Sequence, residues 1–433
     1  MDPSPLYLGI DFGTGGCRTI AIDEKHEVIA SSAVSMPAPR RQGKEITQDA
    51  LVWWQALVDC LESLGKHINL KRIARLAVDG TSSTVLLCNA VGEPLAPALL
   101  YNDARADREA KTIASRAGKT SGAIGTGSSL AKVLWLLNNS ETVSAAFIQH
   151  QADWISGKLT GRFGHSDYHN ALKLGFDPEQ ETWPDWIIKL GISRNWLPRV
   201  HAPGDIYGTI QPERAVQLGL SHQTQVVAGT TDSIAAFLAS GARDIGDAVT
   251  SLGTTLVLKL LSDKPVISGE YGIYSHRLED RWLVGGASNC GGGVLRKYFS
   301  DEEMAKRMLQ LRPDTSTGLN YYPLPGPGER FPINDPDLMP RIEPIPQDRT
   351  IFFQGLLEGI AQVEQRGYRL LQEIGAPPPK QVFTTGGGYQ NRAWSEIRQG
   401  LLGVPVKPAR NPEAAFGSAL LAAGHTGGFS TDQ

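Results

Sequence analysis

Residues 8–23 read LGIDFGTGGCRTIAID, and this stretch decides how the first part of the chain folds. Apolar runs at 6–10 and 18–22 have the composition of β-strands, and the glycine-rich segment between them predicts a hairpin turn. The run EVIASSAV at 27–34 predicts a third antiparallel strand. The chain is therefore expected to begin with three antiparallel strands, the first of which ends at an acidic residue.

The hairpin turn has the chemistry of an anion site. Gly13 and Gly15 leave backbone N–H groups open to close approach because they carry no Cβ atom, and Thr14 adds a hydroxyl donor. Asp11 would repel a phosphate group, but it is well placed to hold, through water, a Mg²⁺ ion that bridges phosphates. The alternative interpretation is an ordinary glycine hairpin beside an exposed acid, and the segment alone is compatible with both.

A helix and a further strand complete the first module. Apolar residues recur at helical spacing in residues 47–68, TQDALVWWQALVDCLESLGKHI, with Thr47 as the expected N-cap. Residues 73–84, IARLAVDGTSST, then predict a buried strand that ends in a polar turn. Strands and a helix in this order predict an α/β fold.

A similar order of elements returns in the second half of the chain. Residues 225–242, QVVAGTTDSIAAFLASGA, predict a strand, a turn and a short helix, and residues 247–261 predict a second hairpin. A long amphipathic helix is expected at about 350–374, because apolar residues form one broad face there. The chain is therefore expected to contain two halves built to a related plan, 1–222 and 223–433.

The second hairpin repeats the chemistry of the first. Gly253, Thr254 and Thr255 form its tip in the sequence TSLGTTLVL. Two such tips that face each other across a cleft could clasp a polyphosphate from both sides.

A third glycine-rich turn lies at residues 384–394, TTGGGYQNRAW. Gly387 and Gly388 follow a predicted strand, and an adenosine could lie flat against their backbone with Asn391 and Trp394 nearby. A plain strand–helix connection is the alternative for this turn.

The composition excludes several classes of protein. A chain of 433 residues is too long for one ordinary core and indicates two or three domains. A net charge of −3 without a basic excess argues against nucleic-acid binding. Neither a membrane span nor a signal peptide is expected, since no long uncharged apolar run is present and the first residues lack the basic and apolar regions of a leader. Four scattered cysteines are typical of reduced thiols, so a cytoplasmic protein is expected.

The order DFGTGG, TSLGTT and TTGGG resembles the first phosphate, second phosphate and adenosine segments of the actin/hexokinase/Hsp70-like ATPases. Within that superfamily, residues 127–139, GSSLAKVLWLLNN, resemble the first signature of the FGGY carbohydrate kinases, with Lys132 and Trp135 in the matching places. The resemblance covers nearly the whole chain and is strongest to the ribulokinase/xylulokinase-like branch. It implies two RNase-H-like domains flanking a deep cleft, a sugar-binding domain at 1–222 and a nucleotide-binding domain at 223–433, with ATP and Mg²⁺ as cofactors.

The resemblance also implies roles for individual residues. Asp232 in GTTDS matches the catalytic base, which accepts the proton of the sugar hydroxyl as the oxygen attacks the γ-phosphorus, and Asp11 lies beside the sugar and the metal. Ser82 in AVDGTSST matches a position that contacts the sugar. From the residues alone, Asp232 could equally be a helix N-cap and Ser82 an ordinary turn serine.

The expected activity is ATP-dependent phosphorylation of a ketopentose, first of all D-ribulose to D-ribulose 5-phosphate, with xylulose or another polyol as the alternative substrate. An ATP-switched scaffold of the actin/Hsp70 kind is the alternative from another class of protein. The expected partner is the sugar, and the chain is expected to be a monomer or a homodimer. The roles of Tyr101 and Tyr389 stay open, and Asp103 and Arg105 either lie near the sugar or form a surface ion pair.

Overall fold

The computed structural model describes residues 4–118, 121–139 and 144–424, except for the side chains of Tyr389 and Gln390. Contacts within the chain divide it into two compact units, Met1–Ala239 with Glu413–Gln433, and Ser240–Pro412. This division differs from the expected one at residue 222. Residues 225–239 add strands and a helix to the first unit, and the last helix of the chain returns to that unit as well.

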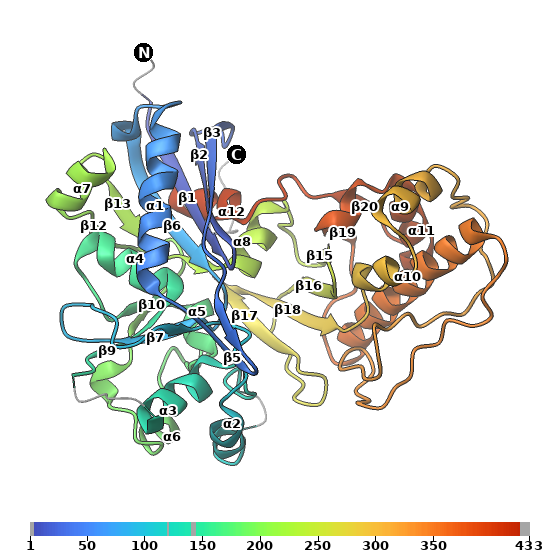
Figure 1. Ribbon diagram of the computed structural model, residues 1–433, viewed down its shortest axis with the longest axis horizontal. Helices are drawn as coiled ribbons and strands as arrows, with labels where there is room; N and C mark the ends of the chain where they lie inside the picture. The colour runs from blue at the N-terminus through green and yellow to red at the C-terminus, as the bar shows by residue number, and fades with distance from the viewer. Residues whose placement is uncertain (1–3, 119–120, 140–143, 425–433) are drawn as a thin grey trace. The chain divides into compact units, whose positions relative to one another are not determined.

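The first unit is built on a seven-stranded sheet with the order β12-β13-β6-β1-β2-β3, in which β14 also pairs with β6 (Figure 1). β1 is antiparallel to β2 and parallel to β6, as expected for a hairpin followed by a crossover through a helix. The strands are β1 (Leu6–Gly13), β2 (Gly16–Ile22), β3 (Val28–Ser35), β6 (Ile73–Gly80), β12 (Ile206–Thr209), β13 (Gln225–Val227) and β14 (Thr230–Thr231).

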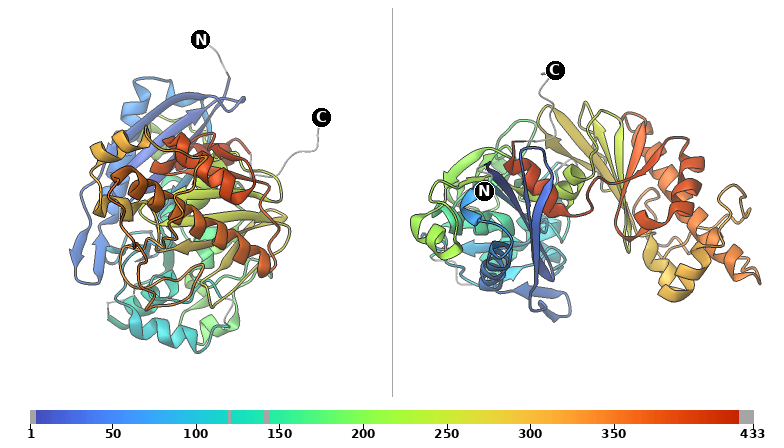
Figure 2. Two further views of the ribbon diagram at one scale, coloured as in Figure 1. Left: turned by 90° about the vertical axis from the view of Figure 1, so that its right-hand side faces the viewer. Right: turned by 90° about the horizontal axis from the view of Figure 1, so that it is seen from above.

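Helices cover both faces of this sheet. Alternate residues of β1, among them Leu8 and Ile10, pack against α1 (Ala50–Gly65), α4 (Gln151–Thr160) and α7 (Pro212–Leu218). On the other face, Ile20 and Ile22 of β2 pack with α8 (Asp232–Ala239) and α12 (Ala414–Ala422). Figure 1 shows these two helices side by side on one side of the sheet, and Figure 2 shows the same arrangement from other directions. Because side chains alternate along a strand, Asp11 points to the face covered by α8 and α12.

The helix expected at 47–68 is shorter than the sequence suggested, and Thr47 is not its cap. Thr47 lies in β5 (Glu45–Gln48), and the carboxylate of Asp49 accepts a hydrogen bond from the backbone N–H of Leu51 at the start of α1. The expectation was wrong because a pairing between β5 and β8 extends the strand to Gln48 and leaves the next polar residue as the cap.

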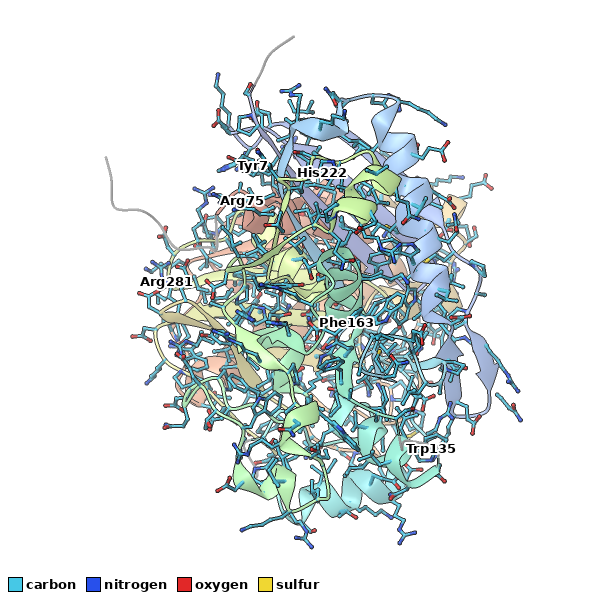
Figure 3. All side chains as sticks on the ribbon, turned by 90° about the vertical axis from the view of Figure 1, so that its left-hand side faces the viewer. Tyr7, Arg75, Trp135, Phe163, His222 and Arg281 are labelled. Atoms are coloured by element: carbon cyan, nitrogen blue, oxygen red, sulfur yellow. The ribbon has the colours of Figure 1, made fainter. Side chains whose placement is uncertain are left out.

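A smaller five-stranded sheet, with the order β4-β5-β8-β7-β9, occupies the other end of the first unit. Figure 3 labels Trp135 of α3 near this end, and Tyr7 and Arg75, register partners at the beginning of β1 and β6, near the opposite end. The elements here are β4 (Arg40–Gln42), β5, β7 (Val85–Cys88), β8 (Ala98–Leu99), β9 (Phe147–His150), β10 (His165–Asp167), β11 (Arg199–His201), α2 (Asp107–Ala114), α3 (Ser129–Asn139), α5 (Tyr168–Leu172), α6 (Asp185–Ile188) and the 3₁₀ helix η2 (Arg194–Trp196). The 3₁₀ helix η1 (Leu70–Arg72) directly precedes β6.

The second unit repeats the plan of the first. Its six-stranded sheet has the order β17-β18-β16-β15-β19-β20, and β15 is antiparallel to β16 and parallel to β19. The run β18-β16-β15-β19 therefore corresponds to β3-β2-β1-β6, which confirms that the two halves share one plan. The strands are β15 (Asp247–Leu252), β16 (Leu256–Ser262), β17 (Tyr274–Leu278), β18 (Arg281–Ser288), β19 (Gln381–Thr385) and β20 (Val406–Pro408).

Helices and a long ordered segment complete the second unit. The helices are η3 (Gly292–Lys297), α9 (Asp301–Met308), α10 (Arg349–Glu373), η4 (Gly387–Gln390) and α11 (Arg392–Leu402). The proline-rich segment before α10 is not helical, and its side chains Tyr321, Leu324 and Phe331 are buried in the core of the unit. None of the helices in the described part of the chain is long and apolar enough to cross a lipid bilayer.

The return of α12 to the first unit depends on glycine. A Cβ atom on Gly9 of β1 would overlap the carbonyl oxygen of Ala415, and a Cβ atom on Gly417 of α12 would overlap that of Ala235 in α8. The backbone of α12 is therefore in direct contact with both β1 and α8, at the end of the sheet where Asp11 lies.

Gly417→Ala should lower the free energy of unfolding of the first unit by about 1–3 kcal/mol, because the added methyl group forces α12 away from α8. Gly400→Ala is the matched control, since Gly400 lies in α11 with nothing within 4 Å of the place that a methyl group would take. This control should leave stability unchanged or raise it by about 0.5–1 kcal/mol. Urea unfolding followed by circular dichroism measures both. Equal stability of the two variants would contradict the close packing of α12.

Candidate active site

Three acidic side chains gather at one edge of the first unit's sheet. Asp11 of β1 is the register partner of Asp79 of β6, and Asp79 is in turn the partner of Thr230 of β14. All three strands are parallel, so these partners face the same side of the sheet. Asp232 follows two residues after Thr230, as the first residue of α8. Parallel pairing thus brings Asp11 and Asp232, the two predicted acids, to one edge together with Asp79.

Asp79 is fully buried, and its two oxygens have different surroundings. Oδ2 accepts a hydrogen bond of 2.5 Å from the hydroxyl of Ser418 on α12, whereas Oδ1 has no hydrogen-bond partner in the part of the chain that the structure describes. Burial raises the pKa of the Asp79 carboxyl well above its usual range, and the negative charges of Asp11 and Asp232 raise it further against the opposing effect of Ser418. Sequence reasoning missed Asp79, although its place at the end of a buried strand, like that of Asp11, was a usable signal.

Asp11 has a cationic neighbour that sequence reasoning also missed. Arg18 is its partner across the β1–β2 hairpin, and Nη1 of Arg18 lies 3.3 Å from Oδ2 of Asp11. The arginine side chain is 51% exposed, and its Nε atom lies 3.6 Å from the carboxylate of Glu413. A guanidinium group at this place, next to the open hairpin tip, can neutralise an anion that binds there.

Asp232 lies at the start of α8, as the helix-start interpretation expected. Its side chain is half-buried, and Oδ1 accepts a 2.6 Å hydrogen bond from the backbone N–H of Ser233 in the first turn of α8. The N-terminus of a helix favours a negative charge, so α8 stabilises the ionised carboxylate. The helix-start interpretation is therefore compatible with a role of this carboxylate in proton transfer.

The first hairpin exposes backbone at its tip. Gly13 and Gly16 are register partners, and Thr14 and Gly15 form the turn between them. Gly15 is exposed, with nothing within 4 Å of a Cβ position, whereas a Cβ atom on Gly16 would lie 2.7 Å from the carbonyl oxygen of Val34. Gly16 therefore serves strand packing, and the exposed tip of the hairpin is formed by Thr14 and Gly15.

In the second unit, the tip of the β15–β16 hairpin is supported by a run of glycines. The N–H group of Gly292 donates to the carbonyl of Gly253 at 2.8 Å, and that of Gly293 donates to the carbonyl of Thr254 at 3.1 Å. A Cβ atom on Gly293 would lie 2.7 Å from the Thr254 methyl group, so the close contact between residue 293 and the hairpin tip requires glycine. The carbonyl groups of Gly253 and Thr254 are thereby occupied, and both residues are exposed at the tip of the hairpin.

The third predicted turn lies beside this hairpin. Ser251 of β15 and Thr385 of β19 are partners in a parallel pair, so both strands end at the same edge of the second sheet. The hairpin tip and the triple-glycine turn begin at that edge. Gly386 has a φ of 78°, and a Cβ atom there would lie 2.7 Å from the carbonyl oxygen of Leu252. Gly387 is open, with nothing within 4 Å of a Cβ position. The structure therefore brings the second hairpin and the triple-glycine turn together.

Trp394 does not occupy the place expected for an adenine contact. Its side chain is 3% exposed, belongs to the core of the second unit and donates from Nε1 to the carbonyl of Leu357 at 3.1 Å. It also lies 2.8 Å from a Cβ position on Gly388 and so shapes that turn by packing. A tryptophan shortly after a glycine run can face either the ligand or the core, and here the apolar face of α11 turns it inward.

Asn391 is the N-cap of α11. Its Oδ1 atom accepts a 3.0 Å hydrogen bond from the N–H of Trp394, and its buried Nδ2 atom has no hydrogen-bond partner among the described residues. The amide oxygen therefore fixes the start of the helix. The side chain of Tyr389, whose role the sequence left open, lies outside the described residues.

A buried ion pair fixes the two strands that lead to these turns. Arg398 of α11 binds Glu364 of α10 through Nε and Nη2, both at 2.7 Å, and donates from Nη1 to Thr384 of β19 at 2.7 Å. Thr250 of β15 donates to the same glutamate at 2.5 Å. One network of paired charges therefore holds β15, β19 and both helices, and with them the hairpin tip and the triple-glycine turn.

The segment around Ser82 is held from several sides. Ser82 is half-buried, and both the N–H and the hydroxyl of the preceding Thr81 donate to Oε1 of Gln151 at 3.0 Å. The N–H of the exposed Tyr101 donates to the hydroxyl of Thr84 at 3.0 Å, so the turn after β8 lies directly against this segment.

Asp103 and Arg105 form an ion pair, but the pair is enclosed and not on the surface as the second interpretation had it, because the two side chains are only 0% and 10% exposed. Arg105 donates to both carboxylate oxygens of Asp103, at 2.8–3.0 Å, and stacks on the ring of Trp135 with 4.6 Å to its centroid. Asp103 is fully buried and also accepts from the N–H of Ile46 at 2.7 Å. The pair is therefore a structural link between β5 and the turn after β8.

Asp79→Asn should raise the free energy of unfolding at neutral pH. The variant lacks the titratable carboxyl group that is costly to bury, and the amide oxygen of the asparagine can still accept the hydrogen bond from Ser418. A carboxyl group whose pKa is raised by folding costs stability as the pH rises above its unfolded value of about 3.9, since the unfolded chain ionises while the folded chain keeps its proton. The midpoint of unfolding of the Asp79→Asn variant should therefore exceed that of the wild type by more at about pH 7 than at about pH 5. Asp185→Asn is the control, because this side chain is 82% exposed, and the difference between its midpoint and that of the wild type should not grow with pH. A difference between the two midpoints that becomes smaller as the pH rises would contradict a raised pKa of Asp79.

Comparison with known proteins identifies the family. The model of the FGGY family of carbohydrate kinases, N-terminal domain, matches residues 6–239, and that of the C-terminal domain matches residues 248–425. Xylulose kinase of Escherichia coli (strain K12) is 24% identical over 96% of this chain and 89% of its own length, and gluconokinase of Bacillus subtilis (strain 168) is 23% identical over 97% and 87%.

A solved structure confirms the fold class. The crystal structure of a xyloylose kinase from Brucella ovis superposes with a TM-score of 0.88 over 97% of this chain and 90% of that one, at 24% identity. The chain therefore has the expected mixed α/β fold with two domains of the actin-like ATPase type. It belongs to the FGGY family of carbohydrate kinases, enzymes that transfer a phosphate group from ATP to a hydroxyl group of a sugar.

Proposed function

We propose that this chain transfers the γ-phosphate of Mg·ATP to the terminal 5-hydroxyl of a ketopentose. The observation that carries the proposal is the group of acidic side chains Asp11, Asp79 and Asp232 at one edge of the first unit's sheet, next to the open tip of a glycine hairpin. Phosphoryl transfer has a loose transition state and depends on alignment and charge neutralisation, for which carboxylates, hydroxyls and backbone N–H groups suffice.

Asp232 is the proposed catalytic base. A carboxylate has several lone-pair sites, so this side chain can keep its hydrogen bond to the backbone of α8 and still accept the proton of a sugar hydroxyl. A base acts within hydrogen-bond reach of that proton, which the start of α8 permits because the side chain is only half-buried. Ser82, from the strand end beside Asp79, is the proposed second contact to the polyol.

The second unit is the proposed site of the nucleotide. The tip formed by Gly253, Thr254 and Thr255 offers N–H and hydroxyl groups to phosphate oxygens, and the open backbone of Gly387 and Gly388 offers a flat surface to adenosine. The amide hydrogens of Asn391 are suited to a hydroxyl or ring acceptor of the nucleoside. Trp394 is left out of this site because it is buried in the core.

The donor groups of the first unit fit a magnesium ion that arrives with ATP. No group of three or more histidine, cysteine or acidic side chains in the described part of the chain is arranged to hold a metal ion by itself. Mg²⁺ usually keeps several waters and uses one or two carboxylates together with phosphates, so a single carboxylate, Asp11, acting through water is sufficient. Bound in this way, the ion would neutralise charge on the phosphates, and Arg18 would be free to move from Asp11 to a phosphate oxygen.

The relatives favour xylulose over D-ribulose, which the sequence analysis placed first. A xylulose kinase is among the curated relatives that match over almost the whole chain, and a gluconokinase is another. D-Xylulose and D-ribulose differ only in the configuration of one secondary hydroxyl, and a site that hydrogen-bonds such a hydroxyl can discriminate strongly between them. Membership of a carbohydrate kinase family also favours sugar chemistry over the ATP-switched scaffold considered from the sequence.

With Mg·ATP, the purified chain should form ADP many times faster in the presence of its ketopentose than in its absence, because productive alignment requires the sugar hydroxyl. A coupled assay of ADP formation with D-xylulose, D-ribulose, gluconate and glycerol measures this, and phosphorus NMR identifies the phosphate ester formed. The highest kcat/KM is expected for D-xylulose. ATP turnover that ignores every sugar would contradict the proposed function.

Asp232→Asn should lower kcat by about 10²–10⁴-fold and leave the KM for ATP nearly unchanged, because the amide cannot accept the proton. Asp11→Asn should raise the KM for Mg·ATP as well as lower kcat. Steady-state kinetics of both variants test these roles, with Asp185→Asn as a control at an exposed acid of the same unit. Equal and mild effects at Asp11 and Asp232 would show that the roles are misassigned.

A further inference from the structure

Lys132 of α3 is fully buried, and its partners are carbonyl oxygens. The ammonium group donates to the carbonyls of Ser83 at 3.0 Å, Tyr101 at 3.2 Å and Gly127 at 3.1 Å. These carbonyls belong to three different turns, which follow β6, follow β8 and precede α3. One side chain therefore ties together three segments that are far apart in the sequence.

The buried charge of Lys132 needs these contacts. Burial and, to a smaller extent, the charge of Lys173 lower the pKa of the ammonium group to about 7, and Asp103 acts in the opposite direction. Three carbonyl dipoles directed at the group offset part of the cost of burial, because each satisfies one of its three N–H donors. Lys132 and the three turns are thus mutually dependent.

Ser83 is the most constrained residue among the partners of Lys132. Its φ angle is 72°, in the left-handed region that residues with a Cβ atom rarely adopt. Such a conformation persists only where the surroundings enforce it, and it is often found at functional sites. The carbonyl of Ser83 is held by Lys132 itself, and the side chain is 1% exposed with an Oγ atom that has no hydrogen-bond partner among the residues that the structure describes.

The neighbouring turn carries a second buried polar atom without a partner. Asn102 follows directly after Tyr101, whose N–H binds Thr84 and whose carbonyl binds Lys132. Oδ1 of Asn102 is buried, and none of the residues described by the structure forms a hydrogen bond with it. Buried polar atoms are nearly always paired in native proteins, so two orphaned atoms on adjoining turns indicate a place that a polar ligand completes.

We propose that Lys132 is a positioning residue of the sugar site, which holds Ser83 in its left-handed conformation and fastens the turn of Asn102 against it. In this arrangement Ser82 and Asn102 present a hydroxyl and an amide to the hydroxyl groups of the polyol. Lys132 acts through the turns and does not touch the substrate. The inference rests on the proposed function, because it assigns the polyol to this part of the first unit.

Lys132→Met, Ser83→Gly and the double variant test the proposal. Lys132→Met should raise the KM for the ketopentose about 10- to 100-fold through misplacement of the turns, and it should change the KM for ATP by less than about twofold. Glycine adopts a positive φ without strain, so Ser83→Gly in the Lys132→Met background should lower the raised sugar KM at least about threefold. Lys158→Met is the matched control, at a half-buried lysine that lies over the rings of Trp54 and Trp154, and it should leave the sugar KM unchanged.

Other outcomes would overturn the proposal. If Lys132→Met changes the KM values for sugar and ATP alike, or if Ser83→Gly gives no recovery, Lys132 has a general structural role only. If Lys132→Met does not fold, Asn102→Ala decides: an unchanged sugar KM at unchanged thermal stability contradicts the proposal, and a rise of at least about tenfold supports it. A wild-type chain that phosphorylates no sugar would overturn the proposed function and this inference together. If the wild type is active and the variants give one of the contradicting results, only the inference about Lys132 is overturned.

Discussion

The parallel pairing of β1 with β6, and of β6 with β14, determines where the acidic side chains of the first unit meet. Each of these strands places a residue at the same level of the sheet, so Asp11, Asp79 and Thr230 share one edge and one face. A carboxyl group enclosed in this way is costly, as the raised pKa of Asp79 indicates. The buried Asp79 carboxyl group is stabilised by α12, which supplies the hydroxyl of Ser418 and packs closely through Gly9 and Gly417.

Buried polar groups recur behind the segments that are proposed to bind substrates. In the second unit, Arg398 and Glu364 connect the strands that lead to the hairpin tip and to the triple-glycine turn. In the first unit, Lys132 connects three turns through carbonyl oxygens, and Asp103 with Arg105 connects a further pair of elements. Loops that are open to solvent at their tips are thus anchored by buried charges at their bases, which limits their movement while it leaves their backbone accessible.

The sequence predicted those features that depend on neighbouring residues. Both glycine hairpins, the triple-glycine turn and the start of α8 at Asp232 were visible as local patterns, and the two related halves followed from their order. Asp79 and Arg18 were missed because their proximity to Asp11 depends on strand register, which no local pattern states. The return of α12 was missed because the whole of the other unit, Ser240–Pro412, lies between α8 and α12 in the sequence. Trp394 was misplaced because a tryptophan on an amphipathic helix shows its burial only when the helix is packed.

A crystal structure of the chain with a ketopentose and a non-hydrolysable ATP analogue tests the central claim most directly. The account predicts a primary hydroxyl of the sugar within about 2.6–3.2 Å of the Asp232 carboxylate, with Asp11 on the same side of the sugar. A sugar bound away from the shared edge of β1, β6 and β14, with Asp232 turned to solvent or to another partner, would contradict it.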